Sequence, residues 1–205
     1  MIDEQLLEAK LQRVSFATLG HFLEDGFVSY FIRSQLSGVK MIGRARTLRI
    51  ANADAFAVNL ALVALQPGEV LVIDMLGDHQ HACVGTVTSC AAAAQGARGI
   101  VVDGMVTDIL ELRAAKLPVF ARGTSLLTTK LHGNSASKQD VEVRCGGTTV
   151  RPGDWVLGDE NGLLISSTSA LAGVIDDALC SDAAEPALLQ RINRGEPINT
   201  LLRLD

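Results

Sequence analysis

The stretch between residues 54 and 122 alternates helical patterns with short apolar runs, and this alternation restricts the possible folds more than any other feature. In order, the stretch reads as an Ala- and Leu-rich helix, the run VLVID, a helix of small residues over about 82–95, the run GIVVDG, a further helix VTDILELRAAKL and the strand PVFAR. The apolar runs have the length and composition of strands buried on both faces. Strands that alternate with helices predict βαβ units with right-handed crossovers, and therefore a parallel sheet.

The segment from residue 141 to residue 166 has a different character. It contains short β-strand patterns separated by the turn pairs Gly146-Gly147, Pro152-Gly153 and Asn161-Gly162. Glycine at these places allows the tight reversals that connect antiparallel strands. We therefore predict an α/β fold with a parallel α/β half and an antiparallel β half.

Helical patterns are predicted at both ends of the chain. The first 36 residues read as helical, with one helix from Ser15 to Gly26, and a helical tail covers residues 167–205 with breaks near Pro186 and Pro197. Because 205 residues are enough for one sizeable core and no linker composition interrupts them, we expect a single domain over 1–205.

Composition excludes several classes of function. The net charge of −5, the lack of Lys/Arg clusters and the 4% aromatic content disfavour a nucleic-acid partner. No signal-peptide pattern is present and the most apolar stretch is interrupted by polar and turn residues, so we expect a cytoplasmic protein without a membrane span. The four cysteines show no zinc-like spacing, and we expect all of them to be reduced and buried. No GxGxxG or GxSxG motif is in the required context.

Two carboxylates follow the buried run GIVVD where a helical pattern begins. Asp103 ends the run, and Asp108 follows Thr107 at the start of the helix. Carboxylates are preferred ligands of Mg²⁺ and related cations, so Asp108 is a candidate metal ligand and Asp103 a candidate site residue. Structural roles are the alternative: Thr107 is a suitable N-cap, an acid in the first turn complements the helix dipole, and Asp103 can cap the turn before Gly104.

The stretch GDHQH after VLVID contains a second group of polar side chains. On an extended segment His79 and His81 would share one face, and imidazole is a common metal ligand. The alternative, which we favour, is that Asp78 and the two histidines belong to an ordinary exposed loop.

Taken together, the sequence resembles the RraA-like family, which includes the 4-hydroxy-4-methyl-2-oxoglutarate aldolases and the regulators of ribonuclease activity. The resemblance covers nearly the whole chain, in order, through SFATLGHFLEDG, GRARTLRI, QPGEVLVID, ACVGTVTSCAAAAQGARGIVVDGMVTDILEL, PVFARG and VRPGDWVLGDENGLLIS. It implies a swivelling β/β/α domain that forms a homotrimer or homohexamer with sites between subunits.

The resemblance also implies a metal-dependent chemistry. In the aldolases Mg²⁺ or Mn²⁺ polarises the 2-keto oxygen of the substrate and stabilises the enolate left by cleavage of a carbon–carbon bond. The corresponding metal ligand here is Asp108. Backbone amides at a glycine-led helix start would hold the substrate carboxylate, and the matching element is Gly85, Thr86, Val87 and Thr88. Close packing of a helix of small residues is an alternative reason for this element.

Two positions depart from the family pattern. The arginine expected directly before the metal-binding aspartate is Thr107, and the acid expected after the glycine is Thr86. Losing one partner of a desolvated charge pair costs about 2–5 kcal/mol. Thr107 carries no charge and cannot form a bidentate contact, so altered or reduced aldolase activity is expected, with Arg122 as a candidate replacement cation.

Three functions are therefore open at this point. The first is a divalent-metal-dependent lyase of the retro-aldol or decarboxylation type that acts on a small oxo-acid or a related enolisable substrate, with Asp103, Thr107 and Asp108 as catalytic candidates. The second is a non-catalytic regulator that binds a protein partner, as the ribonuclease regulators do. The third is a biosynthetic enzyme that uses the same scaffold on a different substrate.

Overall fold

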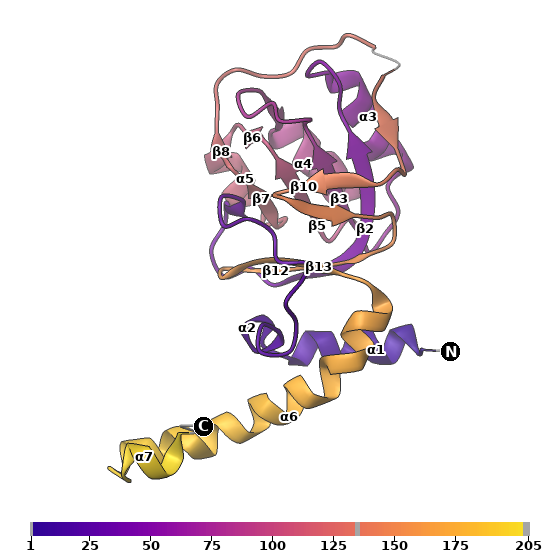
Figure 1. Cartoon of the computed structure of the whole chain (residues 1–205). Coiled ribbons are helices and arrows are strands. Elements are labelled where there is room, and N and C mark those ends of the chain that lie inside the picture. Colours follow the sequence, from indigo (N-terminus) through magenta and orange to yellow (C-terminus); the bar gives the residue numbers. More distant parts are fainter. Residues whose placement is uncertain (1, 134–135, 203–205) are drawn as a thin grey trace. The chain divides into compact units, whose positions relative to one another are not determined.

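The computed structural model describes residues 2–133 and 136–202, which form two compact units (Figure 1). One unit consists of residues 25–167 and contains the sheet. The other combines the described parts of 1–24 and 168–205 and is helical. The single domain expected over 1–205 stays a prediction, whereas the mixed α/β fold class is confirmed.

The larger unit is built around an eight-stranded sheet with the order β1-β7-β5-β3-β2-β12-β13, in which β9 also pairs with β2. The bounds of these strands are β1 Arg33–Ser34, β2 Met41–Arg49, β3 Glu69–Asp74, β5 Gly99–Asp103, β7 Val119–Ala121, β9 Lys138–Gln139, β12 Trp155–Asp159 and β13 Gly162–Ser166. Strands β2, β3, β5 and β7 are parallel, and the alternating pattern predicted this for β3, β5 and β7. The hairpin β12–β13 and the edge strand β1 are antiparallel.

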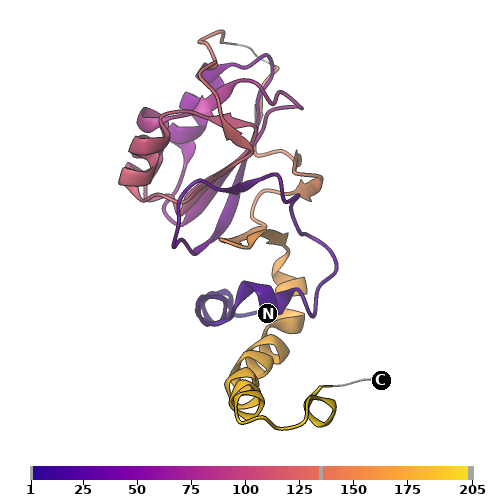
Figure 2. The ribbon, with the colours of Figure 1, turned by 90° about the vertical axis from the view of Figure 1, so that its left-hand side faces the viewer.

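Two hydrophobic cores cover the two faces of this sheet. Strand β3 shows the division, because Leu71 and Ile73 belong to one core while Val70 and Val72 belong to the other. The first core is closed by the helices α3 Ala55–Ala64, α4 Thr86–Ala94 and α5 Ile109–Ala115. The second is closed by the hairpin β10 Val143–Cys145 with β11 Thr148–Val150 and by Val28 and Ile32 (Figure 2). Burial on both faces explains why the central strands are continuously apolar.

A second, three-stranded parallel sheet was not predicted. It consists of β4 Ala82–Val84, β6 Met105–Val106 and β8 Gly123–Thr124, in the order β4-β6-β8. The predicted helix over 82–95 is therefore wrong in its first turn, because the chain stays extended to Val84 and the helix begins only at Thr86. Cross-strand pairing gives these short segments hydrogen-bond partners that no local pattern reveals.

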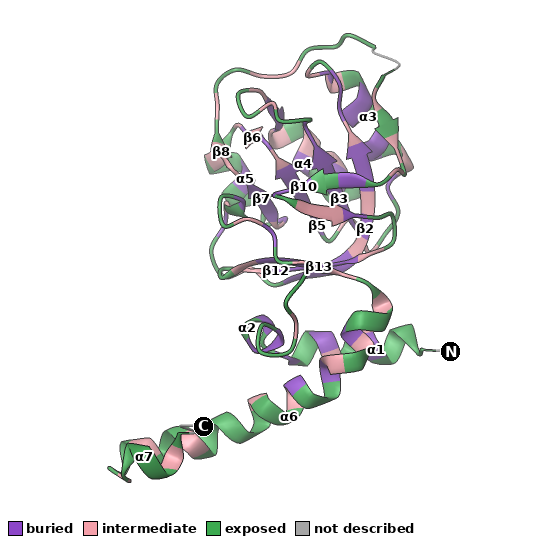
Figure 3. Ribbon diagram, in the orientation of Figure 1, coloured by how far each residue is buried: buried purple, intermediate pink, exposed green. Residues whose placement is uncertain are grey.

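The smaller unit contains α1 Glu4–Arg13, α2 Phe16–Leu19, α6 Thr168–Asn193 and α7 Ile198–Leu201. Polar contacts join its two segments: Lys10 Nζ lies 2.6 Å from Asp176, and Asp182 accepts hydrogen bonds from the Ser15 amide and the Thr18 hydroxyl. Helix α6 is mostly exposed (Figure 3) and continues through Pro186, so the predicted break there is wrong, whereas Pro197 does start a new helix.

The prediction that the first 36 residues are helical is wrong beyond Leu19. The apolar residues Val28 and Ile32 have helical spacing, but they lie in an irregular segment and fill the second core of the larger unit. Gly26 adopts φ 91°, and a side chain there would meet the backbone carbonyl of Ile165. A left-handed glycine at this position is incompatible with a continuous helix.

Two further predictions can be compared with the structure. All four cysteines are free, but only Cys83 and Cys145 are buried, so the prediction of burial is wrong for Cys90 and Cys180. In the part of the chain that the structure describes, no helix is both long enough and apolar enough to cross a membrane.

Candidate functional site

Asp103 lies at the carboxyl end of β5 and binds Arg122, the residue that follows the neighbouring strand β7. Its Oδ1 accepts a hydrogen bond from Arg122 Nε at 2.5 Å, and its Oδ2 accepts one from the Gly146 amide at 2.8 Å. The two side chains are largely buried, with 14% of Asp103 and 19% of Arg122 exposed. The structure thus brings together two residues that the sequence singled out separately, and a buried ion pair of this kind fixes the orientation of the guanidinium.

Asp74 is a third polar residue at this edge, and sequence reasoning did not identify it. It ends β3 in register with Asp103 on β5. Its carboxylate accepts hydrogen bonds from the Leu76 amide at 2.7 Å and the Arg144 amide at 3.1 Å. The backbone of β10 therefore crosses the strand ends, and the amides of Arg144 in β10 and of Gly146 directly after it bind the carboxylates of two adjacent strands. The available signal was the shared ending of VLVID and GIVVD, each an apolar strand followed by aspartate.

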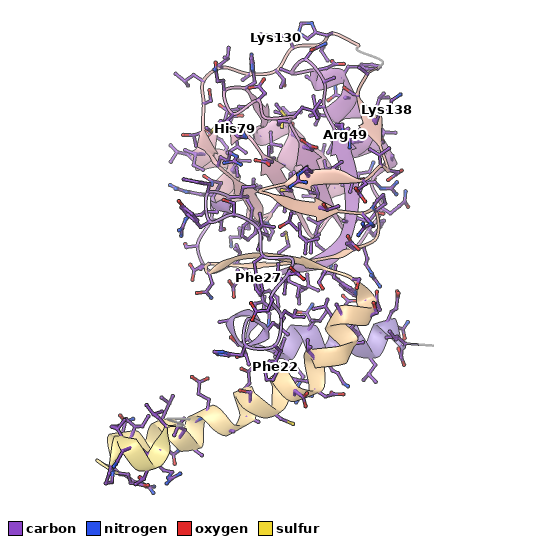
Figure 4. All side chains as sticks on the ribbon, in the orientation of Figure 1. Phe22, Phe27, Arg49, His79, Lys130 and Lys138 are labelled. Atoms are coloured by element: carbon purple, nitrogen blue, oxygen red, sulfur yellow. The ribbon has the colours of Figure 1, made fainter. Side chains whose placement is uncertain are left out.

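The stretch GDHQH also reaches this edge. His79, labelled in Figure 4, places Nε2 3.5 Å from Asp103 Oδ1. His81 instead lies 2.7 Å from the carboxylate of Asp78 through Nδ1, so the two imidazoles have different partners. Partial burial raises the pKa of Asp78, but hydrogen bonds from the Gln80 and His81 amides outweigh this and leave the pKa below its ordinary value. Of the two histidines, His79 is therefore the one that lies beside the Asp103–Arg122 pair.

A second group of predicted residues surrounds Asp108. Its Oδ2 accepts a hydrogen bond from the Thr86 amide at 2.9 Å, and its Oδ1 lies 3.2 Å from the Thr107 hydroxyl. These bonds, chiefly the one from Thr86, hold the pKa of Asp108 below its ordinary value. Gly85 leaves room for this carboxylate, because a Cβ at that position would lie 2.5 Å from Asp108 Oδ2.

The structure corrects the interpretation of Thr107 as the N-cap of the following helix. Helix α5 begins at Ile109, its N-cap is Asp108 with φ 54°, and the side chain of Asp108 does not bond to α5. That side chain binds the first amide of α4, whose own N-cap, Gly85, has no side chain to offer. Asp108 therefore caps a different helix from the one it precedes, and the Thr86 amide predicted to hold a substrate anion is occupied by a protein carboxylate.

The candidate residues fall into two groups at the two ends of the small sheet. Asp103 and Arg122 precede β6 and β8, whereas Thr107 and Asp108 follow β6 and Gly85 and Thr86 follow β4. The three extended steps from Gly104 to Thr107 span about 10 Å at about 3.3 Å per residue. Arg122 makes its ion pair with Asp103 and not with Asp108. The residue next to Asp108 in the chain is the neutral Thr107.

The surroundings of Asp108 can be compared with the needs of a divalent cation. Its side chain is exposed, and the hydrogen bonds from Thr86 and Thr107 leave acceptor capacity on its oxygens. Mg²⁺ often keeps several waters and uses only one or two protein carboxylates. Among residues 2–133 and 136–202, no group of three or more His, Cys, Asp and Glu side chains is arranged to hold a metal. Asp108 thus fits a single-carboxylate anchor and not a closed cage.

Comparison with known proteins now assigns the chain to a family. The family described as RraA-like, Aldolase/RraA, matches residues 19–165, and the chain belongs to this family. A protein of Halalkalibacterium halodurans named "Putative 4-hydroxy-4-methyl-2-oxoglutarate aldolase" is 34% identical over 148 residues, which cover 72% of this chain and 70% of that protein. A protein of Arabidopsis thaliana with the same name, numbered 3, is 41% identical over 103 residues, covering 49% and 60%.

Solved structures support the same assignment. The RNA-processing inhibitor RraA from Thermus thermophilis is 28% identical, with a TM-score of 0.66 over 74% of this chain and 92% of that one. An uncharacterized protein from Pseudomonas syringae pv. tomato aligns over 96% of both chains with a TM-score of 0.79, and at 23% identity it shows the fold alone. The family thus contains proteins named as aldolases and proteins named as inhibitors of RNA processing.

Proposed function

We propose that this protein is a divalent-metal-dependent carbon–carbon lyase that acts on a small oxo-acid by retro-aldol cleavage or decarboxylation. The observation that carries the proposal is the exposed carboxylate of Asp108, fixed by the Thr86 amide and the Thr107 hydroxyl at the start of α4. Membership of a family whose curated relatives are named as 4-hydroxy-4-methyl-2-oxoglutarate aldolases supports it.

Each residue has a defined part in this proposal. Asp108 anchors Mg²⁺ or Mn²⁺, which would polarise the keto oxygen of the substrate. The amides of Val87 and Thr88 have no recorded partner among the described residues and point to a site for the substrate carboxylate at the positive end of α4. Arg122 uses Nε for Asp103 and offers its terminal nitrogens to a second anionic group.

Enzyme assays with Asp108→Asn test the proposal. The wild-type protein with Mn²⁺ should release pyruvate from oxaloacetate or from 4-hydroxy-4-methyl-2-oxoglutarate, and the substitution should reduce the rate at least tenfold. Glu111→Gln is a matched control, because Glu111 is an exposed acid in the first turn of the same helix. Absence of activity in the wild type, or equal activity in Asp108→Asn, refutes the proposal.

A second function is favoured by one specific observation. The Asp108 carboxylate occupies the first amide of α4, so this anion-binding position is satisfied within the protein, and the family arginine is absent at Thr107. Both features suit a regulator that binds a protein partner. A solved structure from Streptomyces coelicolor, 27% identical with a TM-score of 0.74, is described as an unusual member of the RNase ES inhibitor RraA protein family. If this protein is a regulator of the same kind, it should inhibit RNA cleavage by RNase ES, and Asp108→Asn should leave the inhibition unchanged.

The third candidate is the same scaffold with an altered substrate, such as one that is larger or uncharged. Thr107→Arg separates this case and the loss of an ancestral site, taken together, from an independent solution. If the substitution raises aldolase activity, the remaining residues still support the family chemistry. If it does not, the site follows an independent solution.

The expected homotrimer or homohexamer, with sites between subunits, belongs to this proposal as well. Analytical ultracentrifugation of the purified chain would measure it directly. A monomer with full lyase activity would contradict the intersubunit placement of the site.

A further inference from the structure

A cavity of about 760 Å³ lies on the larger unit, and none of the candidate site residues lines it. The segment 33–39, which includes β1, forms one wall. Arg113 and Lys116 at the end of α5 form a second, and Glu160 in the turn between β12 and β13 contributes to the third. This volume is within the range of about 300–1,000 Å³ that small-molecule sites occupy.

Positive charge is concentrated around this cavity. Three of its lining side chains are cations, Arg33, Arg113 and Lys116, and one is an anion, Glu160. The chain as a whole has a net charge of −5, so the local excess is opposite in sign to the rest of the protein. We infer that this cavity binds a small multivalent anion, such as a phosphate ester or a polycarboxylate, at a site separate from the candidate lyase site.

The cations are available to a ligand. Within residues 2–133 and 136–202, no hydrogen bond or ion pair is recorded for the side chains of Arg33 and Lys116. Among the same described residues, Arg113 donates only through Nε, to the Gln35 carbonyl at 3.1 Å. This bond orients the guanidinium and leaves its terminal nitrogens to a ligand. Guanidinium groups bind phosphate and carboxylate in a bidentate manner, and an ammonium adds a third charge.

The helix dipole accounts for only part of this arrangement. Arg113 and Lys116 lie at the carboxyl end of α5, where cations are favoured in any helix. Arg33 comes from an edge strand on the other side of the cavity and receives no benefit from that helix. Its convergence on the same cavity is what indicates a ligand.

The wall that carries Arg33 is held in place by hydrogen bonds. Gln35 donates its amide to the Val119 carbonyl at 2.8 Å and its side chain to the Ala121 carbonyl at 3.2 Å, both on β7. The Gly38 amide donates to Glu160 Oε1 at 2.9 Å, which connects the segment 33–39 to the β12–β13 turn. Glu160, the acid among the lining residues, therefore has a structural role. The cationic side chains therefore project from a preorganised backbone.

The cavity and the proposed metal ligand Asp108 lie at opposite ends of α5. Asp108 precedes the first residue of this helix, whereas Arg113 and Lys116 lie at its last turn and its C-cap. At about 1.5 Å per residue the helix separates the two by on the order of 10 Å. The inference therefore does not depend on the proposed lyase function.

Isothermal titration of the full chain with diphosphate and, separately, with citrate tests the inference. Saturable binding of either anion to the wild type is expected, and the one that binds more tightly distinguishes a phosphate from a polycarboxylate site. The double variant Arg33→Gln/Lys116→Gln should weaken that binding at least tenfold. Lys138→Gln is the matched control, since Lys138 is an exposed lysine of β9 outside the cavity (Figure 4).

Three outcomes would overturn the inference. They are no saturable binding of either anion, equal affinity in wild type and double variant, and an equal loss of affinity in Lys138→Gln. Both substituted side chains are exposed, so the double variant should keep the wild-type melting temperature. If it does not, Arg33→Gln alone is measured and should still weaken binding at least threefold.

Discussion

The ion pair between Asp103 and Arg122 offers a quantitative test of how the sheet edge is held together. Asp103→Asn keeps the size of the side chain and an acceptor for the Gly146 amide, but it removes the charge that faces Arg122 Nε at 2.5 Å. Breaking a fully buried pair costs about 3–5 kcal/mol, whereas exposed pairs contribute about 0–1 kcal/mol. With 14% and 19% of the two side chains exposed, the pair lies nearer the buried limit.

We therefore expect Asp103→Asn to lower the free energy of unfolding by about 2–3 kcal/mol, which corresponds to a decrease in melting temperature of about 4–12 °C for a chain of this size. Urea titration followed by tryptophan fluorescence measures the change. The only tryptophan, Trp155, is 3% exposed and lies in β12 of the same unit, so its emission reports the unfolding of that unit.

A double-mutant cycle with Arg122→Gln isolates the pair itself. The coupling between the two positions should be about 1–3 kcal/mol, so the double variant should be more stable than the sum of the single changes. A coupling near zero, or a loss below about 0.5 kcal/mol in Asp103→Asn, would contradict the reasoning, because it would mean that the buried charges are solvated in some other way.

Three further predictions follow from the remaining contacts. Gly85→Ala places a Cβ 2.5 Å from Asp108 Oδ2, so it should displace that carboxylate from the Thr86 amide. Loss of this cap should lower stability by about 0.5–2 kcal/mol in thermal denaturation, and an unchanged melting curve would refute the contact. The pKa of Asp108 is lower in the folded protein, so its contribution to stability is present above the unfolded pKa of about 3.9 and is lost as pH falls through the folded value. The stability difference between wild type and Asp108→Asn should therefore be larger at pH 7 than at pH 3. A difference that increases in acid would contradict this sign. Burial raises the pKa of the Cys83 thiol to about 12 and also raises that of Cys145, so a thiol reagent at pH 8 should label only the exposed cysteines until the protein is unfolded, and rapid labelling of all four in the native state would refute this burial.

Local pattern was sufficient for the parallel part of the fold. Runs such as VLVID and GIVVD are apolar on both faces, and only a strand covered by helices on one side and a further layer on the other buries such a run completely. The same reasoning failed for residues 20–36, where Val28 and Ile32 have helical spacing but fill a core between non-helical segments. It also failed at 82–84 and 105–106, because strands of two or three residues depend on partners that are distant in sequence.

The sequence by itself determined the α/β class, because hydrophobic periodicity and turn chemistry are written into consecutive positions. Its resemblance to the RraA-like family pointed to Asp108 as the metal ligand. Only the tertiary structure decided how the candidate residues are grouped. It paired Arg122 with Asp103 instead of Asp108, placed the Asp108 carboxylate on the first amide of α4, and brought Arg33 beside the last turn of α5. Such groupings depend on which strand ends and helix ends meet in space, and a linear sequence specifies that only through the packing of the whole sheet.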